Sequence, residues 1–166
     1  MANRIKIKKG LQIPLLGESD QTSRGVVTSK FVRICPEDYP GVAPKLAVKV
    51  DDTVKAGSPL FRDKNHPEMV FVSPVSGVVT RVERGEKRRI LYIEIKADST
   101  NEYVDFGKKA VASLSPDEVK KTILDAGVWF TIRQRPYDIV ALPDKQPRAL
   151  VGVALSFGKS IIGYFD

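Results

Sequence analysis

The chain has 166 residues, of which 42% are hydrophobic and 28% charged, so it can form about one ordinary domain or two small ones and is too short for a large multidomain enzyme. Its 27 lysines and arginines against 20 aspartates and glutamates give a net charge of +7, which favours an anionic partner. The single cysteine, Cys35, excludes an internal disulfide, and together with the single histidine, His66, it leaves a structural zinc site two ligands short unless carboxylates join.

The two rare side chains have ordinary structural interpretations. Cys35 follows the apolar run Phe31–Ile34 and is interpreted as a small buried hydrophobe. His66 lies in a polar segment that ends in proline, and we expect it in a solvated turn. No segment reaches the roughly 18 apolar residues of a membrane span, and Met1–Lys6 lacks the apolar block of a signal peptide. We therefore expect the chain in the cytoplasm or on the cytoplasmic face of a membrane.

Short alternating runs separated by glycine and proline predict strands over the first part of the chain. The spacing of these runs points to a small barrel or sandwich. The predicted strands are Ile5–Lys8, Val26–Ile34, Leu46–Val50, Met69–Val72, Val78–Val82 and Ile90–Ile95.

One helix is predicted after these strands. Ser115 and Glu118 have the spacing of a capping box, Pro116 suits the first helical position, and Gly127 offers a stop. The face turned to the interior is predicted to consist of Val119, Ile123 and Ala126.

These patterns divide the chain into three stages. Residues 1–110 are predicted to form a β-module, and 111–148 the capped helix with an exposed connection. Residues 149–166 open as an apolar strand and are expected to start a second α/β domain that is truncated or non-native in fold. The predicted fold class is mainly β, and α+β overall.

Two related half-motifs, Val48–Phe61 and Val72–Val79, have the order of two hairpin halves that fold over each other. This order resembles the biotinyl/lipoyl carrier module, a barrel-sandwich hybrid, in which a lysine is modified at the tip between the halves. Lys64 lies in the corresponding region, but Arg62–His66 lacks the sequences that surround the modified lysine of known carriers. A carrier with a modified Lys64 is kept as an alternative function.

The densest charged cluster flanks Gly85, which we interpret as the turn of a hairpin. We interpret the cluster as a solvated or protein-contacting hairpin. A small basic barrel that binds nucleic acid is a second alternative, but Tyr92 is the one nearby aromatic on which a base can stack. The charged residues are Arg81, Glu83, Arg84, Glu86, Lys87, Arg88 and Arg89.

The chain offers no catalytic or metal-binding set that we can assign. Asp51 and Asp52 precede Thr53 in a turn, where aspartate is favoured for local hydrogen bonds. Five residues separate Gly152 from Gly158, whereas a phosphate-binding loop has four between its glycines.

Five blocks in one order resemble the A subunit of the sodium-translocating NADH:quinone reductase (Nqr) complex. Family members usually have Gly-Asp where this chain has Asp51-Asp52, and the sequence after Ala149 departs from the family. Because the family's subunit is more than twice as long, the resemblance implies an N-terminal fragment. The matching blocks are Ile5–Leu11, Gly41–Lys64, Ser73–Gly77, Arg84–Arg88 and Gly127–Pro136.

The resemblance implies a soluble subunit peripheral to the cytoplasmic side of the bacterial inner membrane. The complex passes electrons from NADH to ubiquinone and exports sodium ions, with its flavins and iron–sulfur centre on other subunits. We expect this stretch to bind no cofactor and no nucleic acid, to be non-catalytic alone, and to contact other Nqr subunits; no quinone contact can be assigned to a residue. Tryptophan and arginine are favoured interface anchors, so the candidate subunit contacts are Arg84, Lys87, Arg88, Trp129, Arg133 and Arg135.

Overall fold

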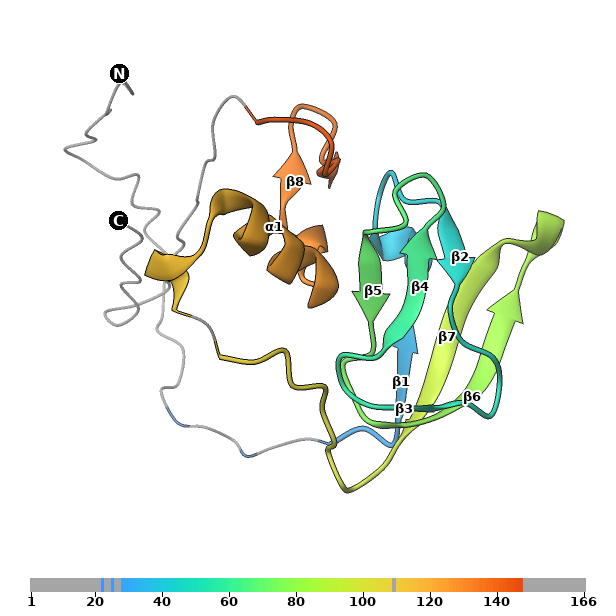
Figure 1. Cartoon of the computed structure of the whole chain (residues 1–166). Helices are drawn as coiled ribbons and strands as arrows, with labels where there is room; N and C mark the ends of the chain where they lie inside the picture. Colours follow the sequence, from blue (N-terminus) through green and yellow to red (C-terminus); the bar gives the residue numbers. More distant parts are fainter. Residues whose placement is uncertain (1–21, 23–24, 26–27, 109, 148–166) are drawn as a thin grey trace, which may run out of the picture. The chain divides into compact units, whose positions relative to one another are not determined.

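The computed structural model describes residues 22, 25, 28–108 and 110–147 (Figure 1). Residues 28–147 belong to one compact unit. The predicted strand Ile5–Lys8 and the segment after Ala149 lie outside the described residues.

Nine short strands, one α-helix and four 3-10 helices make up the described part of the chain. In chain order they are β1 (Phe31–Ile34), η1 (Pro36–Asp38), β2 (Pro44–Leu46), β3 (Thr53–Val54), β4 (Pro59–Asp63), β5 (Val70–Val72), β6 (Gly77–Arg84), η2 (Glu86–Arg88), β7 (Ile90–Ala97), η3 (Val111–Ser113), α1 (Pro116–Asp125), η4 (Trp129–Thr131), β8 (Arg133–Gln134) and β9 (Ile139–Val140).

The strands form three antiparallel sheets. A four-stranded sheet has the order β1-β7-β6-β3, a three-stranded sheet the order β2-β4-β5, and β8 pairs with β9. In Figure 1 the two larger sheets lie against each other. Short strands that alternate between buried and exposed side chains suit such a sandwich, because each sheet turns one face to a shared core. The predicted β-module is therefore the scaffold of this unit.

The core lies between these sheets and is built from inward-facing side chains of both. Phe61 of β4 and Phe71 of β5 are paired across the strands, and their rings stack with centroids 4.6 Å apart. Tyr39, just after η1, packs edge-on against Phe71 at 4.7 Å and against Phe130 of η4 at 5.2 Å. Aromatic contacts of this kind contribute beyond their buried area, so they hold η1 and η4 on the sandwich.

Helix α1 has the predicted cap at its start and the predicted stop at its end. The hydroxyl of Ser115 accepts a hydrogen bond from the backbone N–H of Glu118, whose carboxylate accepts one from the N–H of Ser115 in return. Gly127 has φ +70° and donates to the carbonyl of Leu124 at 3.1 Å, as in a Schellman motif. A Cβ at Gly127 would lie 2.5 Å from Cγ1 of Val72, so the helix end passes very close to β5.

The inner face of α1 differs from the prediction. Val119, Ile123 and Ala126 are only half-buried, whereas Leu124 is buried and belongs to the core. The buried stripe is therefore shifted by one residue. Lys120 is also half-buried, because its ammonium donates to the carbonyl of Pro143.

Two strand predictions had wrong bounds. The observed strand β2, Pro44–Leu46, overlaps the predicted strand Leu46–Val50 only at Leu46. The chain turns after it at Asp52, whose carboxylate accepts from the N–H of Lys49 at 2.7 Å, and Asp51 has φ +72°. The predicted turn at Asp51 and Asp52 is thereby confirmed. The strand predicted from Val26 begins at Phe31.

Candidate functional site

The first candidate group lies at the end of the β6–β7 hairpin. Arg84 is the last residue of β6, and the backbone N–H of Arg89 donates to the carbonyl of Glu86 at 3.1 Å. This bond closes a two-residue turn with Lys87 and Arg88 at its centre, at φ +52° and +61°. Gly85 was expected to be the turn, but it has φ −93° and pairs with Arg89 beside the turn.

Both central residues of this turn are in a conformation that disfavours them. Two-residue hairpin turns of this kind usually contain Asn-Gly, because both residues need positive φ. A left-handed backbone costs an ordinary L-residue about 1–2 kcal/mol. Lys87 and Arg88 are exposed, and neither side chain has a hydrogen-bond or ion-pair partner among the described residues. The apex of the hairpin therefore presents two cations without a side-chain partner, and their backbone conformation lowers the stability of the folded state.

The neighbouring arginines are held against the protein. One guanidinium N–H of Arg84 donates to the carbonyl of Arg88 at 3.4 Å. Arg89 forms an ion pair with Glu37 of η1, with N and O 3.0 Å apart. The latter pair connects the hairpin to η1.

The second candidate group surrounds β8. Trp129 is half-buried against the core, and its indole N–H donates to the carbonyl of Ala141 at 2.7 Å. Its one polar group is therefore satisfied inside the chain. Arg133 and Arg135 are exposed; Arg135 lies 3.7 Å from a carboxylate oxygen of Asp138.

Sequence reasoning missed one exposed aromatic in this group. Tyr137, at the turn between β8 and β9, is 79% exposed, and Asp138 beside it has φ +54°. The segment Arg135-Pro136-Tyr137-Asp138 has the composition of a turn, and this signal was available in the sequence. An exposed tyrosine beside two arginines has the residue types that dominate binding energy at protein interfaces.

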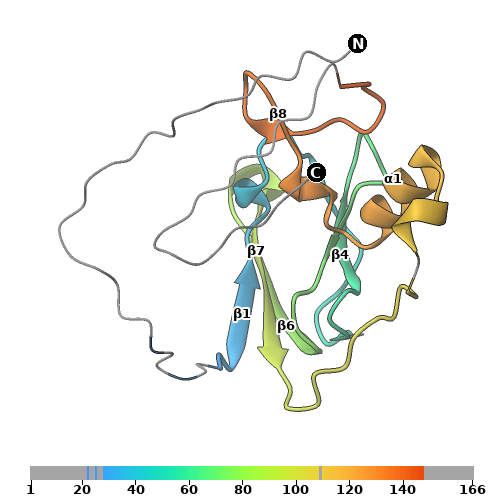
Figure 2. The same ribbon diagram turned by 90° about the vertical axis from the view of Figure 1, so that its left-hand side faces the viewer.

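The 3-10 helix η1 brings the two groups to one end of the unit. Glu37 of η1 pairs with Arg89, and the carbonyl of Asp38, the next residue, accepts a hydrogen bond from Arg133 at 3.5 Å. In Figures 1 and 2 the β6–β7 turn, η1 and β8 lie at a similar height, and in Figure 1 the turn and β8 are on opposite sides of the unit with η1 between them. We call this surface the basic end; it consists of Arg84, Lys87, Arg88, Arg89, Arg133 and Arg135.

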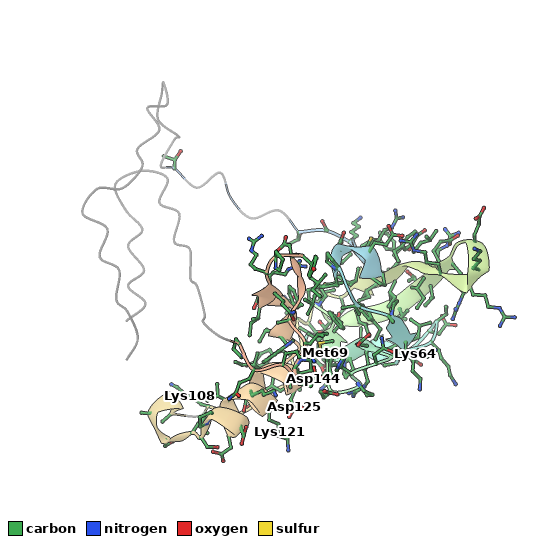
Figure 3. The ribbon with its side chains drawn as sticks, turned by 90° about the horizontal axis from the view of Figure 1, so that it is seen from above. Lys64, Met69, Lys108, Lys121, Asp125 and Asp144 are labelled. Carbon is green, nitrogen blue, oxygen red and sulfur yellow. The ribbon has the colours of Figure 1, made fainter. Side chains whose placement is uncertain are left out.

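The turn between β4 and β5 holds Lys64. Its side chain is exposed, while Asp63 beside it is buried and accepts hydrogen bonds from the N–H of Ala43 at 2.8 Å and of His66 at 2.9 Å. His66 is in a turn as predicted but is not freely solvated: its side chain is 22% exposed, with Nδ1 3.1 Å from Asp63 and Nε2 3.6 Å from Asp144. Figure 3 shows Lys64 and Asp144 in this region. The contacts fix the turn, and the Lys64 ammonium takes no part in them.

Cys35 is half-buried rather than buried. Burial raises the pKa of its thiol, and the nearby carboxylates of Asp38 and Glu37 raise it further. A raised pKa keeps the thiol protonated, which does not favour a nucleophile. Within residues 28–108 and 110–147, no three of the His, Cys, Asp and Glu side chains lie together in a way that could hold a metal ion.

Tyr92 is covered by an arginine on the outer face of the large sheet. The guanidinium of Arg33 lies 4.8 Å from the centre of the Tyr92 ring and forms a 2.8 Å ion pair with Glu94. The hydrogen bond from Arg33 lowers the pKa of Glu94, which keeps the carboxylate ionised. The ring that base stacking requires is thus already occupied by a cation.

Comparisons with known proteins match two consecutive parts of the chain. A family model described as the NqrA N-terminal barrel-sandwich hybrid domain matches residues 5–98, and one described as the NqrA second alpha/beta domain matches residues 114–156. The predicted barrel-sandwich module followed by the start of an α/β domain is confirmed. The boundaries at residues 110 and 148 and the six candidate subunit contacts stay predictions.

Three relatives are each named as the A subunit of a Na(+)-translocating NADH-quinone reductase. The protein from Neisseria meningitidis is 36% identical over 148 residues, which are 88% of this chain and 33% of the relative. The one from Tolumonas auensis is 36% identical over 154 residues, covering 91% and 34%. The one from Pseudomonas aeruginosa is 34% identical over 153 residues, covering 91% and 34%. The chain therefore spans about a third of the length of these relatives.

Proposed function

This chain belongs to the NqrA family, the A subunits of the Na(+)-translocating NADH-quinone reductase, and from that premise we propose that it works as a structural module of such a complex. In this proposal the assembled enzyme passes electrons from NADH to ubiquinone and exports sodium ions. The module positions the complete subunit but carries out no chemical step itself. Flavins, the iron–sulfur centre and the NADH site belong to other subunits, and ubiquinone is bound by the complete subunit.

The proposed place of the chain is the cytoplasmic side of the bacterial inner membrane, as a peripheral component. In the described ranges no helix has both the length and the apolar character that crossing a membrane requires. In this proposal, contacts with other subunits hold the chain in the complex.

The observation that carries the proposal is the joining of both candidate groups at the basic end. Glu37 and Asp38 connect arginines that are more than forty residues apart in the sequence. The exposed members, together with Tyr137, provide arginine and tyrosine, the residues most often found as interface anchors. Trp129 supports this surface from within, by packing against the core beneath β8 and β9.

Affinity capture tests this function directly. The tagged protein, expressed at its natural length in its own host, is captured from detergent-solubilised membranes, and the partners are identified by mass spectrometry. The expected result is recovery of membrane-embedded and flavin-bearing partners with sodium-stimulated NADH:quinone activity. Recovery of the chain alone, or with nucleic acid and no membrane partner, would contradict the proposal.

A further inference from the structure

A shallow groove at the basic end lies between the edge strand β2 and the β6–β7 hairpin. Its volume is about 370 Å³. Apolar and cationic side chains line it together: Pro44, Leu46 and Ile90 are apolar, and Lys45, Arg84, Arg88 and Arg89 are cationic.

Strand β2 presents free backbone groups along this groove. It is the edge of its sheet, and its partner is β4. Bonds from Lys64 N–H to the Ala43 carbonyl and from Ala47 N–H to the Leu60 carbonyl show that odd-numbered residues of this stretch face β4. The N–H and carbonyl of Leu46 therefore point away from β4, as do the groups of an unpaired edge.

The cations of the groove are largely uncompensated. Lys45 and Arg88 have no carboxylate partner among the described residues, and Arg84 bonds only to a backbone carbonyl. Arg89 is the one that has a carboxylate partner, Glu37. The remaining positive charge faces a groove with an apolar lining, and this combination fits a ligand that has both carboxylates and an apolar side chain.

We propose that this groove binds an extended acidic peptide segment of another subunit. The peptide lies beside β2 and exchanges backbone hydrogen bonds with Leu46, in the manner of β-strand addition. Its carboxylates pair with Arg84 and Arg88, whose planar guanidinium groups suit carboxylates. An apolar side chain of the peptide lies against Pro44 and Leu46, which are half-buried in the groove.

A peptide fits these features better than an anionic lipid surface. Glu37 pairs with Arg89, and Glu86 lies in the same turn as Arg88; an extended peptide can place its carboxylates at the cations alone, whereas a flat anionic surface also approaches these two carboxylates. A membrane also offers no backbone groups for the free edge of β2. The proposal rests on the proposed function for the origin of the peptide, whereas the groove itself can be tested on the purified chain.

Fluorescence anisotropy with the purified 166-residue chain provides the test. The probe is a labelled synthetic peptide in which glutamate alternates with leucine. We expect binding that weakens as salt is added, since the contacts are charged and exposed. The double variant Arg84→Glu/Arg88→Glu should lose about tenfold or more in affinity, because the like charges then repel.

Matched controls make the result specific to the groove. The double variant Lys108→Glu/Lys121→Glu has the same charge change, at two exposed residues that lie near α1 and away from Lys64 in Figure 3. It should keep the affinity of the wild type. A peptide with serine in place of leucine should bind several-fold more weakly, because it lacks the apolar contact.

Three outcomes would overturn the proposal. The first is that both double variants lose peptide affinity to the same extent. The second is that a peptide with lysine in place of glutamate binds as tightly as the acidic peptide, and the third is that the chain binds phosphatidylglycerol vesicles but not the peptide. Unfolding midpoints of all variants are measured first, so that a loss of folding is not taken for a loss of binding. If the chain binds the peptide but captures no membrane partner, the groove proposal is supported and the proposed function is contradicted. If it captures membrane partners but does not bind the peptide, only the groove proposal is contradicted.

Discussion

Replacing Arg88 by glycine should stabilise the protein, although it removes an arginine from the surface. Arg88 has φ +61° at the apex of the β6–β7 hairpin, and its side chain has no partner among the described residues. Alanine at this position keeps the backbone strain and loses the same guanidinium, so Arg88→Ala is the matched control. The two variants differ only in how readily residue 88 adopts positive φ.

The expected difference follows from two opposing terms. Glycine avoids the cost of about 1–2 kcal/mol that a left-handed backbone imposes on other residues. Glycine also has greater conformational freedom in the unfolded chain, which lowers the stability of the folded state by about 0.5–1 kcal/mol relative to alanine. Arg88→Gly should therefore be more stable than Arg88→Ala by about 0.5–1 kcal/mol, which corresponds to a rise in Tm of about 2–4 °C.

Urea unfolding followed by tryptophan fluorescence measures this difference. Trp129 is the single tryptophan of the chain and packs against the core, so its emission reports on the unfolding of this unit. Both variants should lose affinity for the acidic peptide equally, since both lack the guanidinium. Equal stability of the two variants, or lower stability of Arg88→Gly, would refute the inference that the turn is held in a strained conformation.

Three further predictions use the same unfolding assay. Gly127→Ala should lower the free energy of unfolding by about 2–4 kcal/mol, because its Cβ would lie 2.5 Å from Val72 Cγ1 at a backbone φ of +70°. A decrease below about 0.5 kcal/mol would contradict this expectation, because it would show that β5 shifts to accommodate the Cβ at little cost. Asp63→Asn should lower the free energy of unfolding by about 1–3 kcal/mol, because the buried carboxylate accepts three hydrogen bonds. Asp144 is exposed, so the free energy of unfolding of Asp144→Asn should stay within about 0.5 kcal/mol of the wild type. If both variants changed the free energy of unfolding equally, the role assigned to the buried Asp63 carboxylate would be contradicted. Hydrogen bonds from Ser76 and Thr100 lower the pKa of Asp98 below its ordinary value of 3.8, so its stabilising effect is present above that value and is lost as pH falls through the lowered pKa. The stability gap between the wild type and Asp98→Asn should therefore narrow on acidification, and a gap that widens would contradict this sign.

Local signals in the sequence were sufficient for several elements. The capping box of α1 depends on residues within one turn of helix, and Gly127 ends that helix through its own backbone freedom. The strands β6 and β7 were predicted from the short runs Val78–Val82 and Ile90–Ile95, although their burial patterns are irregular where the pairing shifts register. Leu124 was missed as the buried residue of α1, because the capping signals define where a helix starts but not which side the core approaches.

The basic end depends on contacts that no local pattern contains. Arg133 reaches Asp38 across 95 positions of the chain, and only the folded unit brings them together. The turn at Lys87 and Arg88 was misplaced to Gly85, because glycine is the usual signal for such a turn. Where a chain has residues that are unfavourable for the local conformation, function is a frequent reason, and Arg88 of this turn lines the groove.

Charge reversal at the hairpin tests the central claim, that the basic end holds this chain in the reductase complex. Tagged Arg84→Glu/Arg88→Glu is captured from solubilised membranes beside the wild type and Lys108→Glu/Lys121→Glu, and the yield of membrane subunits and the sodium-stimulated NADH:quinone activity are compared. We predict that the hairpin variant loses about tenfold or more of both, while the control variant retains them. Full recovery of subunits and activity by a folded hairpin variant would contradict the claim.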